Sequence, residues 1–250
     1  MRPLTLAALG AAAYAVFLVA LMPASYVAAR LEAATRGGVQ VHEASGSFWS
    51  GSGRATLATP AGPLALEDLE WRFLPARLVA GRLAFAVTGR SAGFDSRAEL
   101  ARSFSMWEAR DVAIDGLAAG AASFMPLIAH WRPEGRLAAK APLLAWNDRE
   151  LRGEARLEWR AAAIALSEVK PLGSYRIDLR GDGAQARVTL STIEGPLAIA
   201  GQGTITPPSR LAFSGEARAE SPAAASLQPL LDLMGPRRAD GSRTLQWKLN

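Results

Sequence analysis

The sequence contains no cysteine, only two histidines and only three lysines among its 28 basic residues. The absence of cysteine excludes a disulfide framework, thiolate metal sites and cysteine nucleophiles, and it leaves the redox compartment undecided. His42 and His130 are far apart in the chain, so the sequence has no histidine pair at metal-ligand spacing. We therefore expect no metal site and no cofactor.

Motifs of common enzyme classes are also missing. There is no G-x-S-x-G elbow and no P-loop lysine motif, and the Gly51-Ser-Gly53 and Gly201-Gln-Gly203 strings have no helix pattern after them. Three groups of carboxylates lie close in sequence, as a glycosidase would need: Glu67/Asp68/Glu70, Asp148/Glu150 and Glu154/Glu158. In alternating strands these side chains are expected to face water, and 148–150 to form a hairpin tip. We expect no catalytic residue and no enzymatic activity.

The charge balance is basic but dispersed. The net charge is +5, with arginines scattered singly and Arg237-Arg238 as the only adjacent pair of basic residues. Nucleic-acid-binding proteins usually gather such residues on one face, so no nucleic-acid partner is expected. If the positive charge has a partner, anionic phospholipid headgroups of an inner membrane are favoured.

One long hydrophobic run is present, at the N-terminus. Residues Pro3 to Ala29 include no charged side chain, and Arg2 precedes them. The length and charge pattern predict a transmembrane signal anchor over 1–29, with a short cytoplasmic N-terminus. A cleaved signal peptide with processing near Val27-Ala28-Ala29 is the alternative. Both place the remaining chain in the periplasm of a bacterium, and the anchor predicts a single-pass inner-membrane protein.

The rest of the chain has the period-2 pattern of β-strands, most clearly in Tyr175–Arg180 and in 186–191. Glycine and proline turn signals separate the alternating segments. The predicted strands are Gly53–Leu57, Leu64–Trp71, Arg82–Thr88, Arg97–Glu99 onward, Ser105–Ile114, Gly135–Ala139, Gly153–Arg160, Tyr175–Arg180, Gln185–Ser191, Leu197–Ile205 and Arg210–Ala217. This spacing predicts a mainly β fold, an open and curved antiparallel sheet with one buried and one wet face.

Two segments instead have apolar residues at helical spacing, Gly120–Ile128 and Ala223–Met234, and the second ends at a Gly-Pro stop signal. Short strings recur along the chain, such as Leu69-Glu-Trp-Arg72 and Leu157-Glu-Trp-Arg160, but at offsets that do not agree. We therefore expect a tether over 30–45 and a β-rich periplasmic domain over 46–250. A soft internal boundary near residue 133 is expected, with one sheet continuing across it.

Seven tryptophans are spread along the chain: Trp49, Trp71, Trp107, Trp131, Trp146, Trp159 and Trp247. They could form an exposed platform for carbohydrate or peptidoglycan, but tryptophans in strands are more often large core or interface residues with a locally bonded indole N–H. Core or subunit contact is the favoured interpretation.

The order of the glycine, tryptophan and proline motifs resembles the type II secretion system protein N family. The residues that carry the resemblance lie in a Gly-Ser-Phe-Trp-Ser-Gly string, a Trp-Arg-Phe-Leu-Pro element, a central segment and a Pro-Leu-Gly-Ser-Tyr string: Gly46, Trp49, Gly51, Trp71, Pro75, Gly135, Trp146, Trp159, Pro171, Leu172, Gly173, Tyr175, Gly195, Pro196 and Leu197. The resemblance extends over essentially the whole chain.

The resemblance implies an accessory inner-membrane subunit of the type II secretion system. Such a subunit would support transport of folded periplasmic proteins across the outer membrane through contacts with other subunits, and the family pattern supplies no catalytic residues. The alternative is a β-groove protein that handles lipid or lipopolysaccharide, which a continuous apolar face open to solvent would favour. A peptidoglycan-binding scaffold is a third possibility, and it would require tryptophans exposed in a row.

Overall fold

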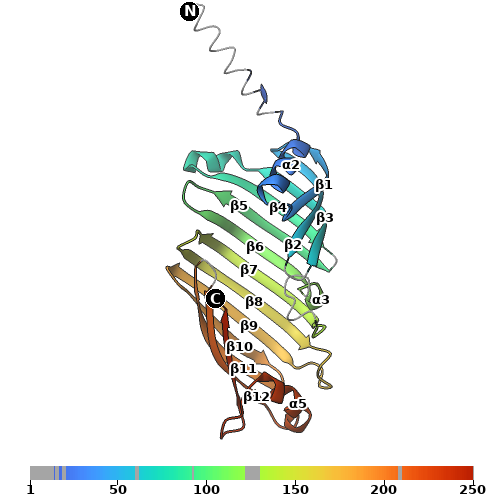
Figure 1. The fold of residues 1–250 in the computed structure, drawn as a ribbon, viewed down its shortest axis with the longest axis vertical. Coiled ribbons are helices and arrows are strands. Elements are labelled where there is room, and N and C mark those ends of the chain that lie inside the picture. Colours follow the sequence, from blue (N-terminus) through green and yellow to red (C-terminus); the bar gives the residue numbers. More distant parts are fainter. Residues whose placement is uncertain are drawn as a thin grey trace, which may run out of the picture.

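The computed structural model describes residues 14, 17–18, 21–59, 62–91, 93–121, 130–207 and 210–249. Within these residues the chain forms one antiparallel sheet of 13 strands, with short helices beside its first and last strands and in two of the connections between strands (Figure 1). The elements are α2 (Ala24–Ala34), β1 (Val39–Gly46), β2 (Ser50–Thr59), β3 (Gly62–Phe73), η1 (Pro75–Ala80), β4 (Leu83–Ser91), β5 (Phe94–Arg102), β6 (Trp107–Leu117), α3 (Ala118–Ala121), β7 (Glu134–Trp146), β8 (Leu151–Ala163), β9 (Gly173–Gly183), β10 (Ala186–Glu194), β11 (Leu197–Thr206), β12 (Arg210–Ala219), α5 (Ala224–Met234) and β13 (Arg243–Leu249).

The strand order is the sequence order from β1 to β13, so each strand pairs with its neighbours along the chain. At about 4.8 Å between strands, the sheet extends roughly 60 Å from its first strand to its last. β6 and β7 pair from Trp107–Trp146 to Leu117–Arg136, so the sheet continues across residue 133. The described strands therefore form an open meander whose two edges are β1 and β13.

Bulges in the middle of the sheet keep its faces distinct. In β6, Trp107 and Ala109 lie on the same face as Val112 and Ile114, although the alternation slips by one residue between them. The slip occurs at Asp111, which has a φ of 48°, and β7 slips at the matching place relative to β8. Because a bulge inserts one unpaired residue, it returns the later apolar side chains to the correct face.

The core of the described residues lies at the C-terminal end of the sheet. α5 presents Leu227, Leu230 and Leu231, all buried, to the strands β12 and β13. Leu197 of β11 and Leu245 of β13, at 2% and 1% exposure, belong to the same cluster, with Ile164, Leu172 and Ala217. The helix expected over Ala223–Met234 is thus confirmed, and it ends at Gly235 as predicted.

The predicted strands all overlap observed ones, β2 to β12, and two strands were not predicted, β1 and β13. The tether expected over 30–45 contains the end of α2 and most of β1, which pairs with β2. Only the start of the helix expected over Gly120–Ile128 is described, as α3, and residues 122–129 lie outside the described residues.

Most of the anchor expected over 1–29 also lies outside the described residues, including all of 1–13. The described residues contain no helix that is long and apolar enough to cross a membrane.

Candidate functional site

The two faces of the sheet differ sharply in chemistry. The cross-strand pairs Phe85–Leu100 and Leu157–Ile177 belong to one face, which we call the apolar face. In the described strands from β4 to β12, the paired positions on this face contain no charged residue apart from Arg102, at the end of β5. Its larger side chains in these strands include Phe85, Val87, Leu100, Val112, Ile114, Leu137, Leu144, Leu157, Ile177, Leu179, Val188 and Leu190.

The apolar face is only partly covered. Most of these side chains are half-buried, and Leu100 and Ile114 are 41% and 37% exposed. α5 covers the face at β12 and β13, which gives that end the core described above. Contiguous exposed apolar surface on a soluble protein usually marks a contact with another molecule.

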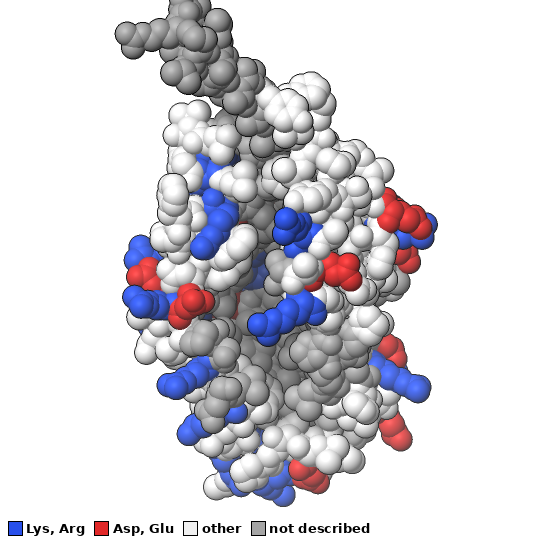
Figure 2. Space-filling model, turned by 45° about the horizontal axis from the view of Figure 1, so that its top comes forward, with Lys and Arg blue, Asp and Glu red and all other residues white. Residues whose placement is uncertain are grey.

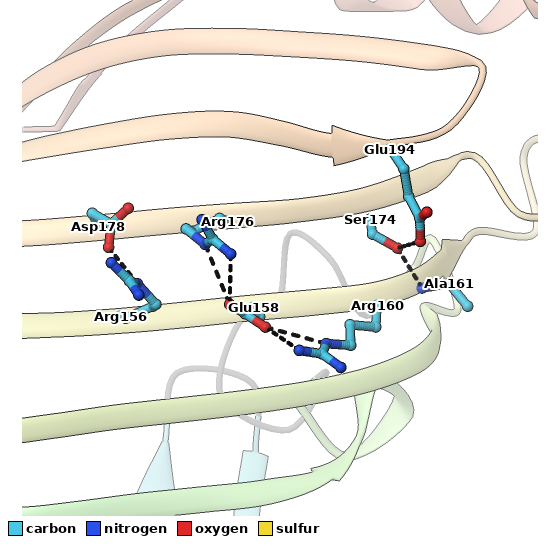
Figure 3. A network of polar contacts seen from close by, with 8 residues as sticks. All are labelled: Arg156, Glu158, Arg160, Ala161, Ser174, Arg176, Asp178 and Glu194. Carbon is cyan, nitrogen blue, oxygen red and sulfur yellow. Dashed lines mark hydrogen bonds and ion pairs between the residues drawn. The ribbon is translucent and has the colours of Figure 1, made fainter.

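The opposite face, here called the charged face, carries a ladder of ion pairs. Between β8 and β9, the directly opposite residues Arg156 and Asp178 are 2.7 Å apart, and Glu158 and Arg176 are 3.0 Å apart (Figure 3). Arg160 adds a second contact to Glu158 at 2.7 Å. The hydrogen bonds from Arg160 and then from Arg176 hold the pKa of Glu158 below its ordinary value. Pairs of this kind, with partners in direct register, favour one strand pairing over a shifted one.

A second group of ion pairs joins η1 and its surroundings to the sheet. Arg77 of η1 donates to Glu99 of β5 at 2.9 Å, and Arg82 donates to Glu108 of β6, also at 2.9 Å. Glu108 is buried, which alone would raise its pKa, but hydrogen bonds from Arg110 and Arg82 outweigh burial and leave the pKa lowered. Figure 2 shows Lys and Arg dispersed singly among uncharged residues on the face in view, several of them beside Asp or Glu.

The histidines and carboxylates that could act in catalysis or metal binding do not come together in a cluster. His42 lies in β1, His130 follows the gap after α3, and Asp148 and Glu150 lie in the turn between β7 and β8, as expected of a hairpin tip. No three His, Asp or Glu side chains in the described ranges are placed to hold a metal ion. The hollows on the charged face are open to solvent and are lined by carboxylates beside arginines, several of them already joined in ion pairs.

The motif residues at the start of the sheet pack around one aromatic cluster. Gly46 and Gly51 are direct partners, and a Cβ on Gly51 would lie 2.5 Å from the Trp71 ring, which leaves room for glycine alone. The indole N–H of Trp71 donates to the carbonyls of Ser47 and Phe48 at 3.2 and 3.1 Å. Trp49 packs on Phe73, and Pro75 then begins η1.

Most of the later motif residues meet at the other end, beside the core. Leu197 N–H donates to the Leu172 carbonyl, and the buried Tyr175 hydroxyl donates to the Leu197 carbonyl, both at 3.0 Å. Burial raises the pKa of Tyr175. A Cβ on Gly195 would collide with the backbone of Gly173, and Pro171 and Pro196 flank these contacts. Trp159 packs near Tyr175 and donates to the carbonyl of Glu134, next to Gly135.

The tryptophans divide between packing and exposure. Trp49, Trp71, Trp131 and Trp159 are half-buried, whereas Trp107, Trp146 and Trp247 are 49%, 36% and 49% exposed. Trp107 at the start of β6 and Trp146 at the end of β7 are direct partners, far along the sheet from Trp247 in β13. The exposed tryptophans therefore do not form the single row that a peptidoglycan platform would need.

A family model for type II secretion system protein N matches residues 37–246, from β1 into β13. The chain belongs to this family. Membership in the protein N family implies involvement in type II secretion, and the family is a secretion component without known enzymatic activity. A component of that system works with its other subunits. No curated protein and no solved structure matches the chain significantly.

Sequence reasoning missed the edges and the exposed apolar side chains of this protein N family member. β13 could have been found, because Leu245 and Trp247 alternate with polar residues. The sequence did not indicate that Val79 and Phe104 are exposed, because apolar residues of these types are as easily buried.

Proposed function

We propose that this protein N family member is a single-pass inner-membrane protein whose sheet lies in the periplasm. There it acts as an accessory subunit of type II secretion, and it supports transport of folded proteins across the outer membrane by binding other subunits. The observation that carries this role is the edge of β13, open beyond its first residues, in a chain of this family.

The edge of β13 is closed over its first residues and open beyond them. Thr244 N–H donates to the Pro236 carbonyl at 3.1 Å, and Arg237 bridges to Arg243, both on the side away from β12. Because backbone N–H groups alternate sides along a strand, those of Gln246 and Lys248 also point away from β12. In the described part of the chain, no further strand lies on this side. An extended segment of a partner can therefore add to the sheet here by β-augmentation.

The edge of β1 is a poorer docking site. α2 packs along β1, and Gln40 of β1 contacts Glu32 of α2 at 3.1 Å. Pro23 bridges to Ser47 just beyond the end of β1. These contacts cover much of the backbone that a partner strand would pair with, so β13 is the favoured edge.

The experiment is crosslinking and pull-down of the tagged full-length protein from inner membranes, with partners and lipids identified by mass spectrometry. Gln246→Pro removes an outward N–H and spares the bonds to β12, and Gln246→Ala is its matched control. We expect the wild type and the alanine variant to recover other secretion subunits and the proline variant to lose most of that recovery. Equal recovery by all three would refute docking at β13, and no recovery by any would refute the assembly role.

Lipid or lipopolysaccharide handling is the second candidate, and one observation favours it. Apart from Arg102 at one end of β5, the apolar face carries no charge at its paired positions from β4 to β12 and is half-exposed, which suits acyl chains better than polar ligands. Recovery of lipid at about one per chain, with no secretion subunit, would support this role over assembly.

A further inference from the structure

Val79 and Phe104, the two most exposed apolar side chains among the described residues, lie at one end of the strands together with four other exposed apolar side chains. They come from η1, from the start of β4, from the β5–β6 turn, from the start of β6 and from the end of β7, all of which lie at the same end of the meander. We call them the rim patch: Leu78, Val79, Leu83, Phe104, Trp107 and Trp146. Val79 and Phe104 are 94% and 100% exposed, and the other four are 36% to 51% exposed.

The rim patch is held rigidly from behind, so its exposure is built into the fold. The ion pair Arg77–Glu99 ties η1 to β5, and the ion pair Arg82–Glu108 ties the residue just before β4 to β6. The amide of Asn147 donates to the Ser105 carbonyl at 3.3 Å, which joins the β7–β8 turn to the β5–β6 turn. These contacts satisfy the charged groups and leave the apolar tips pointing outward.

The same end of the sheet receives the N-terminal segment. Phe48 N–H, in the β1–β2 turn, donates to the Met22 carbonyl at 2.8 Å, and Pro23 bridges to Ser47. The β1–β2 turn lies at the same strand end as η1, because β2 begins where β3 ends. In Figure 1, α2 lies where the N-terminal trace leaves the sheet, and the short teal coil of η1 lies across the sheet from it, also near that end of the molecule. Met22 and Pro23, which belong to the uncharged stretch Pro3–Ala29, therefore meet the sheet at the strand end that carries the rim patch.

Arginine–aromatic pairs flank this end. The guanidinium of Arg102 lies 4.9 Å from the ring centre of Trp107, and that of Arg30 lies 5.3 Å from the ring of Tyr26 in α2. Arg77 and Arg82 are neutralised by their carboxylates, whereas Arg102 has an aromatic partner. Aromatic rings beside arginines are typical of side chains at a membrane interface, where the ring reaches the acyl boundary and the cation meets phosphate.

We propose that the rim patch inserts into the surface of a phospholipid bilayer and seats this end of the sheet on the membrane. The inference rests on the proposed membrane placement of the N-terminal segment. η1 and the β5–β6 turn supply the inserted apolar tips, and Arg102 meets the lipid phosphates. In this arrangement the strands point away from the membrane, and one end of the apolar face lies at the membrane surface.

The absence of cysteine allows a direct test in the full-length protein. Val79→Cys and Phe104→Cys, each labelled with a polarity-sensitive fluorophore, are reconstituted with vesicles of phosphatidylethanolamine and phosphatidylglycerol. Leu233→Cys is the matched control, since Leu233 is 75% exposed on α5 at the far end of the sheet. We expect a blue-shifted emission and several-fold weaker iodide quenching at positions 79 and 104 than at 233.

Iodide quenching at positions 79 and 104 as strong as at 233 would overturn the proposal. Protection that appears only in native membranes, and not in pure lipid vesicles, would also overturn it, because a protein would then cover the patch. The vesicles contain no secretion subunit, so this outcome is independent of the pull-down that tests the assembly role. A double variant, Val79→Glu with Phe104→Glu, should leave the far-ultraviolet circular dichroism unchanged and lower vesicle protection of a label at Leu83→Cys.

Discussion

Truncation of Leu227 to alanine tests how the C-terminal end of the apolar face is closed. Leu227 is fully buried, and it lies in the cluster that joins α5 to Leu197 and Leu245. Removing a buried leucine side chain costs about 2–5 kcal/mol, because burial is lost and a cavity remains. Since about 1.4 kcal/mol is a factor of ten, the equilibrium for opening α5 should shift on the order of 30-fold to several thousand-fold.

The loss of stability should be confined to α5 and the strands that it contacts. α5 contacts β12 and β13, whereas β4 to β7 lie many strands away in the meander. Hydrogen–deuterium exchange with peptide resolution should therefore show faster exchange in 224–234 and in β13, with β4 to β7 unchanged. Leu233→Ala on the same helix is the control, because Leu233 is 75% exposed and its truncation should alter exchange little.

Two results would refute this reasoning. If Leu227→Ala exchanged like Leu233→Ala throughout α5, the helix would not be held by its buried leucines. If exchange rose equally in every strand, the sheet would unfold as one cooperative unit and the local account of its stability would be wrong.

Three further changes probe other parts of the structure. Gly51→Ala places a methyl group against the Trp71 ring, and we expect a loss of about 1–3 kcal/mol in urea unfolding; an unchanged midpoint would mean that the aromatic cluster yields easily. Because the pKa of Glu108 is lowered in the folded state, its carboxylate stabilises the fold above the ordinary value near 4.3 and this contribution is lost as the pH falls through the folded pKa. Urea unfolding of Glu108→Gln should therefore be less sensitive to acid below about pH 4.3 than that of the wild type, and equal slopes would contradict the assignment. Tyr175→Phe leaves the Leu197 carbonyl without its hydroxyl donor and should lower the free energy of unfolding by about 1 kcal/mol. Because burial raises the pKa of Tyr175, ultraviolet titration of the wild type should find it still protonated at about pH 11, above the usual tyrosine pKa of about 10.

The strands were predictable because one face of each is apolar and the other is polar. Tyr175, Ile177 and Leu179 alternate with charged residues and form β9 as expected. β1 was hidden because its alternation is short: the pattern of Val39 and Val41 ends at Glu43, whose φ is 53°. The bulge at Asp111 was also unpredictable, because only the pairing with β5 shows that the residues facing the apolar side change from odd to even numbers there.

The candidate surfaces were harder to predict than the fold. Gly51 lies against Trp71, and Gly195 lies against Gly173, because the fold brings these residues together. The sequence does not show how close they are in space. The resemblance to the protein N family was confirmed by the match over 37–246. The rim patch depends on the ion pair between Arg77 and Glu99, which positions η1. The whole of β4 lies between these two residues in the sequence, so the sequence alone does not show that they meet.

The meander also has a consequence for how the protein is made and how it changes in length. Each described strand finds its partner in the next segment of the chain, so a chain that emerges N-terminus first can pair strand by strand without waiting for distant residues. Each added hairpin would lengthen the sheet by about 10 Å, or two strand spacings, without altering the pairs already made. The recurrence of Leu-Glu-Trp-Arg in β3 and β8 is compatible with growth by such units. A sheet of this kind can be adjusted to the distance it has to cover by gain or loss of whole hairpins.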